Sequence, residues 1–161
     1  MSFSSYFTNK KGCDRIFSVE APKIKFGRGS LKEIGDDARA LGMTRVAVFT
    51  DPKVAQLEAV SIVAESLKSK GLDSVVYDQV AVEPTDISFK QGSKFASEGK
   101  FDGFVSIGGG SVMDTCKASN LYSCYPADFL DYVNAPIGKA VPVPGKLKPH
   151  IACPTTFGTA S

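Results

Sequence analysis

Three consecutive glycines, Gly108, Gly109 and Gly110, precede Ser111 at the end of an apolar segment. These residue types, in this order, are suited to binding an anionic ligand. Glycine lets a backbone turn sharply and approach a ligand with no side chain in between. If a helix begins just beyond the glycines, its free N–H groups and the positive end of its dipole face the turn. Such a turn can bind a phosphate or pyrophosphate. A tight strand-to-helix turn without a ligand is equally consistent with the triplet, so both interpretations stay open.

Two carboxylates could belong to the same site. Asp51 follows the apolar segment 45–50, where an acidic side chain can accept hydrogen bonds from a ribose and repel a 2′-phosphate, which favours NAD over NADP. Asp51 could instead only cap the following helix, which is a common use of aspartate. Asp114 lies three residues after Ser111, so it could complete a capping box or contact a bound ribose or substrate.

A run rich in threonine and glycine gives a third candidate region. The apolar residues from 151 onward predict a strand that leads into a turn containing Thr155, Thr156 and Thr159. Their hydroxyls could bind phosphate or ribose oxygens, or could form only local hydrogen bonds with the backbone. The three candidate regions can serve one ligand only if the fold brings them together.

The composition excludes several classes of function. With 161 residues, 43% hydrophobic and 22% charged, the sequence predicts one globular domain with a substantial core. A net charge of +2 does not suggest a nucleic-acid-binding protein, which usually carries a strong basic excess. No apolar run approaches membrane-spanning length, so we expect no membrane partner. One basic cluster lies among prolines and glycines and is interpreted as a solvated loop: Lys139, Lys146, Lys148 and His150.

The cysteines form no recognisable metal or disulfide motif. Four cysteines are widely spaced without a C-x-x-C pair, and the sequence has a single histidine, which does not fit a zinc site of the usual spacing. Free thiols are typical of a reducing compartment, so we expect a cytoplasmic protein. Residues 1–14 predict a flexible N-terminus and not a secretory signal, because they lack an apolar core.

Alternating strand and helix patterns must position the candidate residues. The expected strands cover 15–19, 45–50, 74–77, 101–107 and the segment from 151, with an extended stretch at 24–26. The expected helices cover 30–42, 57–71, 87–99, the segment from 111 and a short piece at 128–133, before a long loop at 134–149. Ser30 and Glu33 have the spacing of a capping box at the start of the first helix.

This alternation predicts an α/β domain over residues 15–161, with a Rossmann-like, mainly parallel sheet and helices on both faces. The apolar run at 45–50 favours a strand that is buried on both faces. Ligands of such sheets bind at the carboxyl ends of the strands, near a change in strand order. Asp51 and the glycine turn both follow strands, so we expect them to share that edge.

Three separated segments together resemble one known family. Residues 108–111, with Asp114 and Lys117, are similar to the G-G-G-S-x-x-D-x-x-K segment of the iron-containing (group III) alcohol dehydrogenases. Residues 154–161 resemble the P-T-T-x-G-T-x-S turn of that family, and Asp51 resembles its strand-end aspartate. Their occurrence in the right order is much more specific than any one segment.

The segments at 82–86, 113–122 and 128–139 are most similar to the hydroxyacid–oxoacid transhydrogenase branch of the family. That branch implies hydride transfer from 4-hydroxybutyrate to 2-oxoglutarate with the nicotinamide remaining bound. It also implies a mitochondrial location as the alternative to a cytoplasmic one. Glu83 departs from the family, because many members carry Asn in a P-N-P turn at this position.

The resemblance implies NAD as the cofactor and gives the candidate residues their roles. The implied positions are Asp51 for the adenosine ribose, Gly109, Gly110 and Ser111 for the pyrophosphate, Asp114 near the nicotinamide ribose and substrate, and Thr155, Thr156 and Thr159 along the nucleotide cleft.

The family binds Fe(II), or sometimes Zn, through one Asp and three His on a following all-helical domain, and the 161 residues include no such segment. His150 matches none of these ligands. Without the metal nothing stabilises the alkoxide that releases hydride, so we expect a nucleotide-binding portion that is inactive by itself. The alternative is an NAD(P)- or phosphate-binding module without catalysis. Implied partners are a dinucleotide, a small hydroxyacid or alcohol in the full-length family, and a second copy at the face left by the absent domain.

Overall fold

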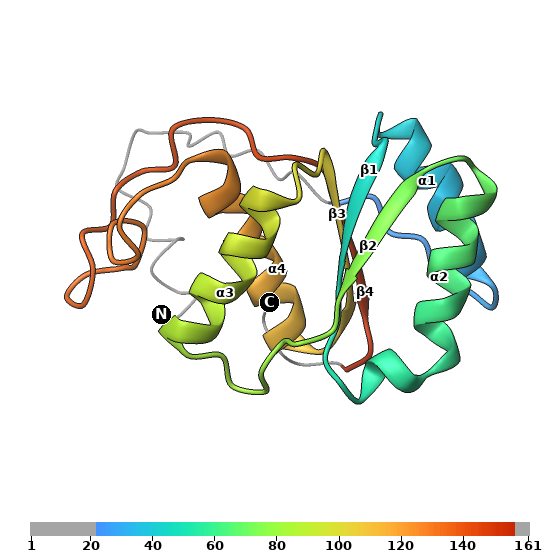
Figure 1. Ribbon diagram of the computed structural model, residues 1–161, viewed down its shortest axis with the longest axis horizontal. Coiled ribbons are helices and arrows are strands. Elements are labelled where there is room, and N and C mark those ends of the chain that lie inside the picture. The colour runs from blue at the N-terminus through green and yellow to red at the C-terminus, as the bar shows by residue number, and fades with distance from the viewer. Residues whose placement is uncertain (1–21, 157–161) are drawn as a thin grey trace, which may run out of the picture.

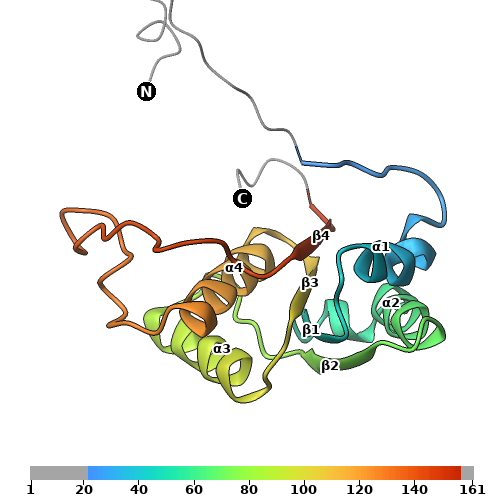
Figure 2. The same cartoon turned by 90° about the horizontal axis from the view of Figure 1, so that it is seen from above.

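The computed structural model describes residues 22–156, whose four strands form one parallel sheet in the order β2-β1-β3-β4 (Figures 1 and 2). The strands are β1 (Arg45–Phe49), β2 (Asp73–Tyr77), β3 (Gly103–Gly108) and β4 (His150–Pro154). The α-helices are α1 (Ile34–Ala40), α2 (Glu58–Ser69), α3 (Asp86–Glu98) and α4 (Gly110–Cys124), and the 3-10 helices are η2 (Ser30–Glu33) and η3 (Val54–Gln56). The predicted parallel α/β fold is confirmed. The predicted strand at 15–19 lies outside the described residues.

The two central strands are those with apolar residues on both faces. Val46, Val48 and Phe49 of β1 are fully buried, and every residue of β3 is buried. Such double burial is characteristic of parallel strands that are covered by helices on both sides. These two strands therefore form a rigid centre for the carboxyl-end loops.

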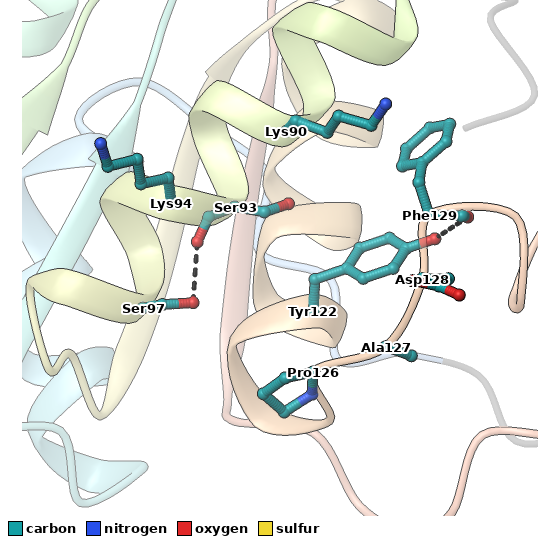
Figure 3. Close-up of a pocket in the computed structure, with 9 residues that line it drawn as sticks. All are labelled: Lys90, Ser93, Lys94, Ser97, Tyr122, Pro126, Ala127, Asp128 and Phe129. Atoms are coloured by element: carbon teal, nitrogen blue, oxygen red, sulfur yellow. Dashed lines mark hydrogen bonds between the residues drawn. The ribbon is translucent and has the colours of Figure 1, made fainter.

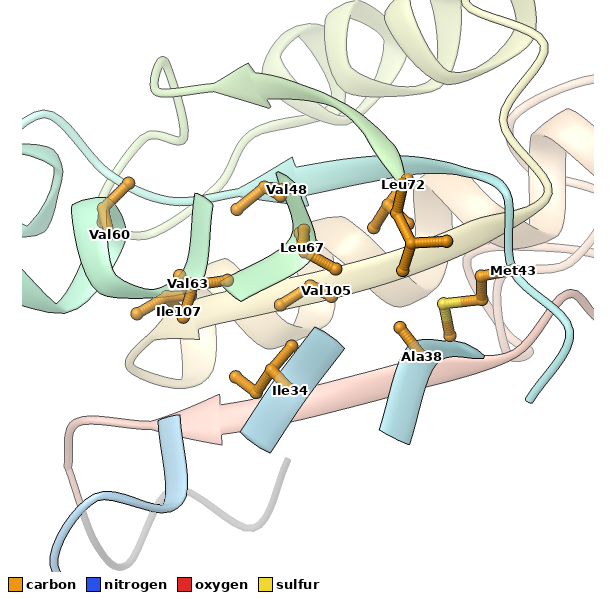
Figure 4. Packing of buried hydrophobic residues seen from close by; sticks show 11 residues of the cluster. Ile34, Ala38, Met43, Val48, Val60, Val63, Leu67, Leu72, Val105 and Ile107 are labelled. Carbon is orange, nitrogen blue, oxygen red and sulfur yellow. The ribbon is translucent and has the colours of Figure 1, made fainter. Parts of the chain in front are cut away.

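Helices cover both faces of the sheet, as predicted. Figure 2 shows α1 and α2 on one side and α3 and α4 on the other. In the first layer, Ile34 of α1 and Val63 and Leu67 of α2 pack against Val48 and Val105 of the sheet (Figure 4). The second layer is rich in aromatic rings, and its members include Phe49, Tyr77, Phe95, Phe101 and Phe104.

The predicted capping box at Ser30 and Glu33 is wrong. Ser30 begins η2, and the N-cap is Gly29, which has a left-handed backbone (φ 85°) and makes no side-chain cap. The Glu33 carboxylate instead binds Lys25, with Nζ 2.7 Å from Oε2. The α-helix consequently begins only at Ile34. The extended stretch predicted at 24–26 forms no strand.

The short helix predicted at 128–133 is also wrong, because this segment forms turns. The carbonyl groups of Leu130, Asp131 and Val133 bond to the returning chain and not to helical partners. The amide of Lys139 donates to the Leu130 carbonyl at 2.9 Å, and the amide of Val141 donates to the Asp131 carbonyl at 2.8 Å. The loop predicted at 134–149 is confirmed, because this segment contains neither helix nor strand.

His150 does not belong to a solvated basic loop, as the sequence suggested, but begins β4 in a partly buried position. Its Nε2 lies 2.8 Å from the hydroxyl oxygen of the fully buried Ser106. Burial lowers the pKa of His150 to about 4, and the nearby positive charge of Lys117 acts in the same direction. The folded protein therefore keeps this imidazole neutral.

The depressed pKa of His150 predicts a loss of stability in mild acid. Between pH 6.5 and about 4 the unfolded chain binds a proton at His150 that the folded chain does not, so stability falls as the pH drops through this window. We expect the free energy of unfolding to fall by about 3 kcal/mol from this residue alone. Urea unfolding at pH 7 and pH 4.5 measures it, with His150→Gln as the control. Equal acid sensitivity of the two proteins would contradict the prediction.

Candidate functional site

The strand order β2-β1-β3-β4 has its switch point at the carboxyl ends of β1 and β3, where a doubly wound sheet is expected to have a crevice. These strands are neighbours, with Phe49 paired to Ser106. After β1 the chain passes through α2 on one face of the sheet, and after β3 it passes through α4 on the other face (Figure 2). The two loops therefore diverge, which is the arrangement where open α/β sheets bind ligands. The hydroxyl of Thr50 joins the two strand ends by donating to the Ile107 carbonyl at 2.9 Å.

The glycine turn lies at this switch point, at the start of α4. Gly109 is the N-cap of α4 and makes no side-chain cap, so the first-turn N–H groups of the helix face the turn. A Cβ at Gly109 would lie 3.0 Å from the Thr156 hydroxyl oxygen, and one at Gly108 would lie 2.5 Å from a methyl group of Val112. The missing side chain at Gly109 thus leaves a space that is bordered by backbone and hydroxyl donors.

The end of β4 supplies the second side of this space. The amide of Thr155 donates to the Gly108 carbonyl at 2.9 Å, which fixes the threonine turn against the glycine turn. Thr155 and Thr156 are both exposed, so their hydroxyls are accessible to a ligand. The structure therefore brings together two of the three candidate regions that the sequence indicated. Thr159 lies outside the described residues.

Ser111 contacts a residue that sequence reasoning did not assign to the site. Its hydroxyl oxygen accepts a hydrogen bond from the backbone amide of Glu83, with a distance of 3.2 Å. Glu83 has a left-handed backbone with φ of 57°, which is unusual for a residue other than glycine. A departure from the family pattern marked this position in the sequence, but nothing indicated a contact with Ser111.

The Asp51 carboxylate bonds to backbone amides at the start of η3, whose N-cap residue is Lys53. Oδ1 of Asp51 accepts hydrogen bonds from the amides of Lys53 at 2.9 Å and Val54 at 3.0 Å. This is the capping interpretation of the residue. A carboxylate has about four lone-pair positions on its two oxygens, so capping through Oδ1 leaves Oδ2 with capacity for a ligand hydroxyl. The two interpretations of Asp51 are therefore compatible.

Asp114 lies farther along α4 than the other candidate residues. It is exposed, and its Oδ1 is 4.0 Å from the Lys117 ammonium on the same helix. Between exposed charges such a pair contributes little to stability. Asp114 forms no capping box, because the N-cap of α4 is Gly109.

The described residues do not offer nucleophilic or metal chemistry in this crevice. Burial raises the pKa of Cys116 well above its ordinary value and that of Cys153 to about 11, so both stay protonated thiols. Across residues 22–156, no three His, Cys, Asp or Glu side chains gather to hold a metal ion. Within the same range no helix is both long and apolar enough to cross a membrane. What the site offers is a set of donors for an anionic group.

A shallow pocket of about 340 Å³ lies elsewhere, between α3, the end of α4 and the following turn. Figure 3 shows Lys90 and Ser93 of α3 on one side, with Tyr122 and Phe129 opposite them. The Tyr122 hydroxyl donates to the Phe129 carbonyl at 2.5 Å, which closes the far side of the pocket. None of the predicted ligand-binding residues lines this pocket, so its location gives no support to the candidate site.

The chain matches a known protein family. The sequence pattern of the family described as "Iron-containing alcohol dehydrogenase" matches residues 21–161. This range includes every candidate residue named above.

Several curated proteins are similar to this chain over nearly its whole length. The hydroxyacid-oxoacid transhydrogenase of Rattus norvegicus, named as mitochondrial, is 51% identical over 152 residues. The mitochondrial protein of the same name from Homo sapiens is 48% identical over 152 residues. The alignments cover 94% of this chain but only 32% of each relative. The chain thus spans about a third of the length of the curated relatives that it matches.

Solved structures show the same fold. A 1,3-propanediol oxidoreductase superposes with a TM-score of 0.78 at 25% identity, covering 91% of this chain and 37% of its own. A sulfoacetaldehyde reductase from Bifidobacterium kashiwanohense, solved in complex with NAD+, gives a TM-score of 0.76 at 25% identity and covers 90% of this chain and 37% of its own.

Proposed function

Because the chain belongs to the iron-containing alcohol dehydrogenase family, we propose that the crevice at the carboxyl ends of β1 and β3 binds NAD. The observation that carries the proposal is the space at Gly109, which a Cβ would fill and which the start of α4 and the Thr156 hydroxyl border. Orphan N–H groups at a helix start favour a pyrophosphate. The sulfoacetaldehyde reductase with bound NAD+ supports the choice of dinucleotide.

Each candidate residue has a distinct part in this proposal. Gly109 and Gly110 let the pyrophosphate approach the backbone, and the Ser111 hydroxyl donates to it. Asp51 accepts from the adenosine ribose through Oδ2 while Oδ1 caps η3. Thr155, Thr156 and Thr159 line the cleft, and Asp114 lies toward the nicotinamide ribose and substrate. The negative charge of Asp51 opposes a 2′-phosphate, so NAD is preferred over NADP.

We propose that a full-length protein with this segment would be a hydroxyacid dehydrogenase of the transhydrogenase type, acting on 4-hydroxybutyrate and 2-oxoglutarate. The names of the curated relatives support this assignment. NAD would carry the hydride between the two acids, and the residues of this chain would bind and orient it. Residues 22–156 do not fit Fe(II), because no three His, Cys, Asp or Glu side chains gather among them. The 161 residues by themselves are proposed to bind the cofactor without turnover.

Calorimetric titration of the chain with NAD and NADPH tests the cofactor proposal. We expect saturable binding of NAD and weaker binding of NADPH, because the Asp51 carboxylate repels the additional phosphate. Circular dichroism in the same buffer establishes that the chain is folded. A folded chain that releases no heat with NAD would refute the proposal.

A binding module for other phosphorylated ligands is the second candidate function. It is favoured by the nature of the donors at the glycine turn, which are backbone amides and hydroxyls and do not discriminate between phosphates. Competition separates the two functions. ADP and inorganic phosphate displace NAD only weakly from a dinucleotide site, whereas a general phosphate site binds them about as well as NAD.

The cellular location and the assembly state complete the proposal. The relatives are named as mitochondrial, which favours the mitochondrial alternative over the cytoplasmic location expected from the cysteines. Self-association stays a prediction. Three large apolar side chains near the carboxyl edge are consistent with it, since Leu57, Val82 and Ile87 are 55%, 72% and 63% exposed.

A further inference from the structure

We propose that Glu83 is a positioning residue of the NAD site, because its backbone amide holds the Ser111 oxygen and so directs the Ser111 hydroxyl proton toward a ligand phosphate. The inference rests on the proposed function, since it assigns the orientation of a donor within the same crevice. It adds a residue from the loop between β2 and α3 to a site otherwise built from the ends of β1, β3 and β4.

The first step concerns the backbone of Glu83. Its φ of 57° lies in the left-handed region, which a residue with a Cβ adopts only at a steric cost. Pro84 follows Glu83, and a proline disfavours the α region of backbone conformation at the preceding residue. The conformation is nevertheless the one that directs the Glu83 amide at the Ser111 oxygen, 3.2 Å away.

The second step concerns the Ser111 hydroxyl, which has one proton and two lone pairs. The Glu83 amide occupies one lone pair, so the proton must point away from this amide. The Thr115 hydroxyl donates to the backbone carbonyl of Ser111 at 2.8 Å. This hydrogen bond does not involve the Ser111 side chain, so the Ser111 hydroxyl proton stays available. Ser111 therefore presents a donor beside the first-turn amides of α4, all of which suit one anionic group.

The test compares substitutions that differ in their tolerance of a left-handed backbone. Valine at position 83 strongly disfavours the left-handed backbone, whereas asparagine tolerates it, so Glu83→Asn keeps the backbone amide directed at Ser111. Lys100→Val is the matched control, because Lys100 has a φ of 50° and lies beyond α3, at the opposite edge of the sheet. The dissociation constant of NAD is measured by calorimetry for the complete 161-residue chain, with unfolding midpoints as the check on folding.

We expect Glu83→Val to weaken NAD binding about fivefold, which corresponds to one lost hydrogen bond. Glu83→Asn should stay within twofold of the unmodified chain, and Lys100→Val should change the unfolding midpoint but not the affinity. The decisive comparison uses Ser111→Ala. In that background Glu83→Val should cause no further loss, because the hydroxyl that it positions is gone.

Two results would overturn the inference while leaving the cofactor proposal intact. One is an unchanged affinity in Glu83→Val, and the other is an equal loss from Glu83→Val with and without the Ser111 hydroxyl. The second result would mean that Glu83 acts on the loop as a whole. If the unmodified folded chain does not bind NAD, the proposed function fails, and the positioning role fails with it.

Discussion

Gly109→Val is expected to weaken NAD binding about 100-fold while leaving the fold intact. A Cβ at this position already lies 3.0 Å from the Thr156 hydroxyl oxygen, and the two additional methyl groups of valine would fill the remaining space. The φ of −80° and ψ of −170° at Gly109 are open to any residue, so the backbone need not change. Losing charge-assisted contacts to both phosphates accounts for the factor of about 100, or ~3 kcal/mol.

Calorimetric titration with NAD measures this loss. Ala127→Val serves as the control, because Ala127 is exposed in the turn after α4 and far along the chain from the crevice. It adds the same two methyl groups and should leave the affinity unchanged. Binding of NAD by Gly109→Val within threefold of the unmodified chain would show that the pyrophosphate does not lie at this turn.

Phe49→Ala is expected to lower the free energy of unfolding by about 4 kcal/mol. Phe49 is fully buried at the end of β1. Its ring centroid is 5.1 Å from that of Tyr77, 5.7 Å from that of Phe95 and 6.2 Å from that of Phe104. Truncation removes the ring and opens a cavity that these large neighbours can fill only in part.

Urea unfolding followed by circular dichroism measures the loss. Phe26→Ala is the matched control, because the Phe26 side chain is 94% exposed and its removal should change stability by less than about 0.5 kcal/mol. Comparable losses for the two variants would contradict the assignment of Phe49 to the core.

The parallel sheet was predictable because its central strands are simple in sequence. Residues 45–50 form a nearly continuous apolar run that contains β1, and the mostly apolar segment 101–107 overlaps β3, which extends to Gly108. Because the carboxyl ends of parallel strands share one edge, the order of elements predicted that Asp51 and the glycine turn lie at the same edge. Here local pattern and topology agree.

The failures have physical causes that lie outside the local pattern. Ser30 and Glu33 fit a capping box, but the Lys25 ammonium competes for the Glu33 carboxylate. Residues 128–133 contain helix-compatible spacing, yet the carbonyl groups of Leu130, Asp131 and Val133 accept hydrogen bonds from the returning chain at 139–141. In both cases a contact that depends on the path of the chain outweighs a local preference.

The residues of the candidate site could be indicated from the sequence, but the contacts between them could not. Spacing and family resemblance indicated Gly109, Ser111 and Thr156, but no local rule joins Ser111 to Glu83 across 28 positions. That hydrogen bond depends on a left-handed backbone at Glu83 that the residue type itself disfavours. The compatibility of the two interpretations of Asp51 likewise required knowing which of its oxygens caps η3.

The irregular segment 125–149 affects how local stability is distributed over the protein. β4 follows this segment, pairs only with β3 among the described strands, and keeps Ala152 and Pro154 exposed. In the described sheet β4 has one paired neighbour, whereas β1 and β3 each have two, so β4 should open before these central strands in native-state hydrogen exchange. The threonine half of the site would leave with it. A ligand that contacts both Gly109 and Thr156 binds only while β4 is paired with β3. By mass action, such a ligand therefore stabilises the pairing of β4 as well as the site.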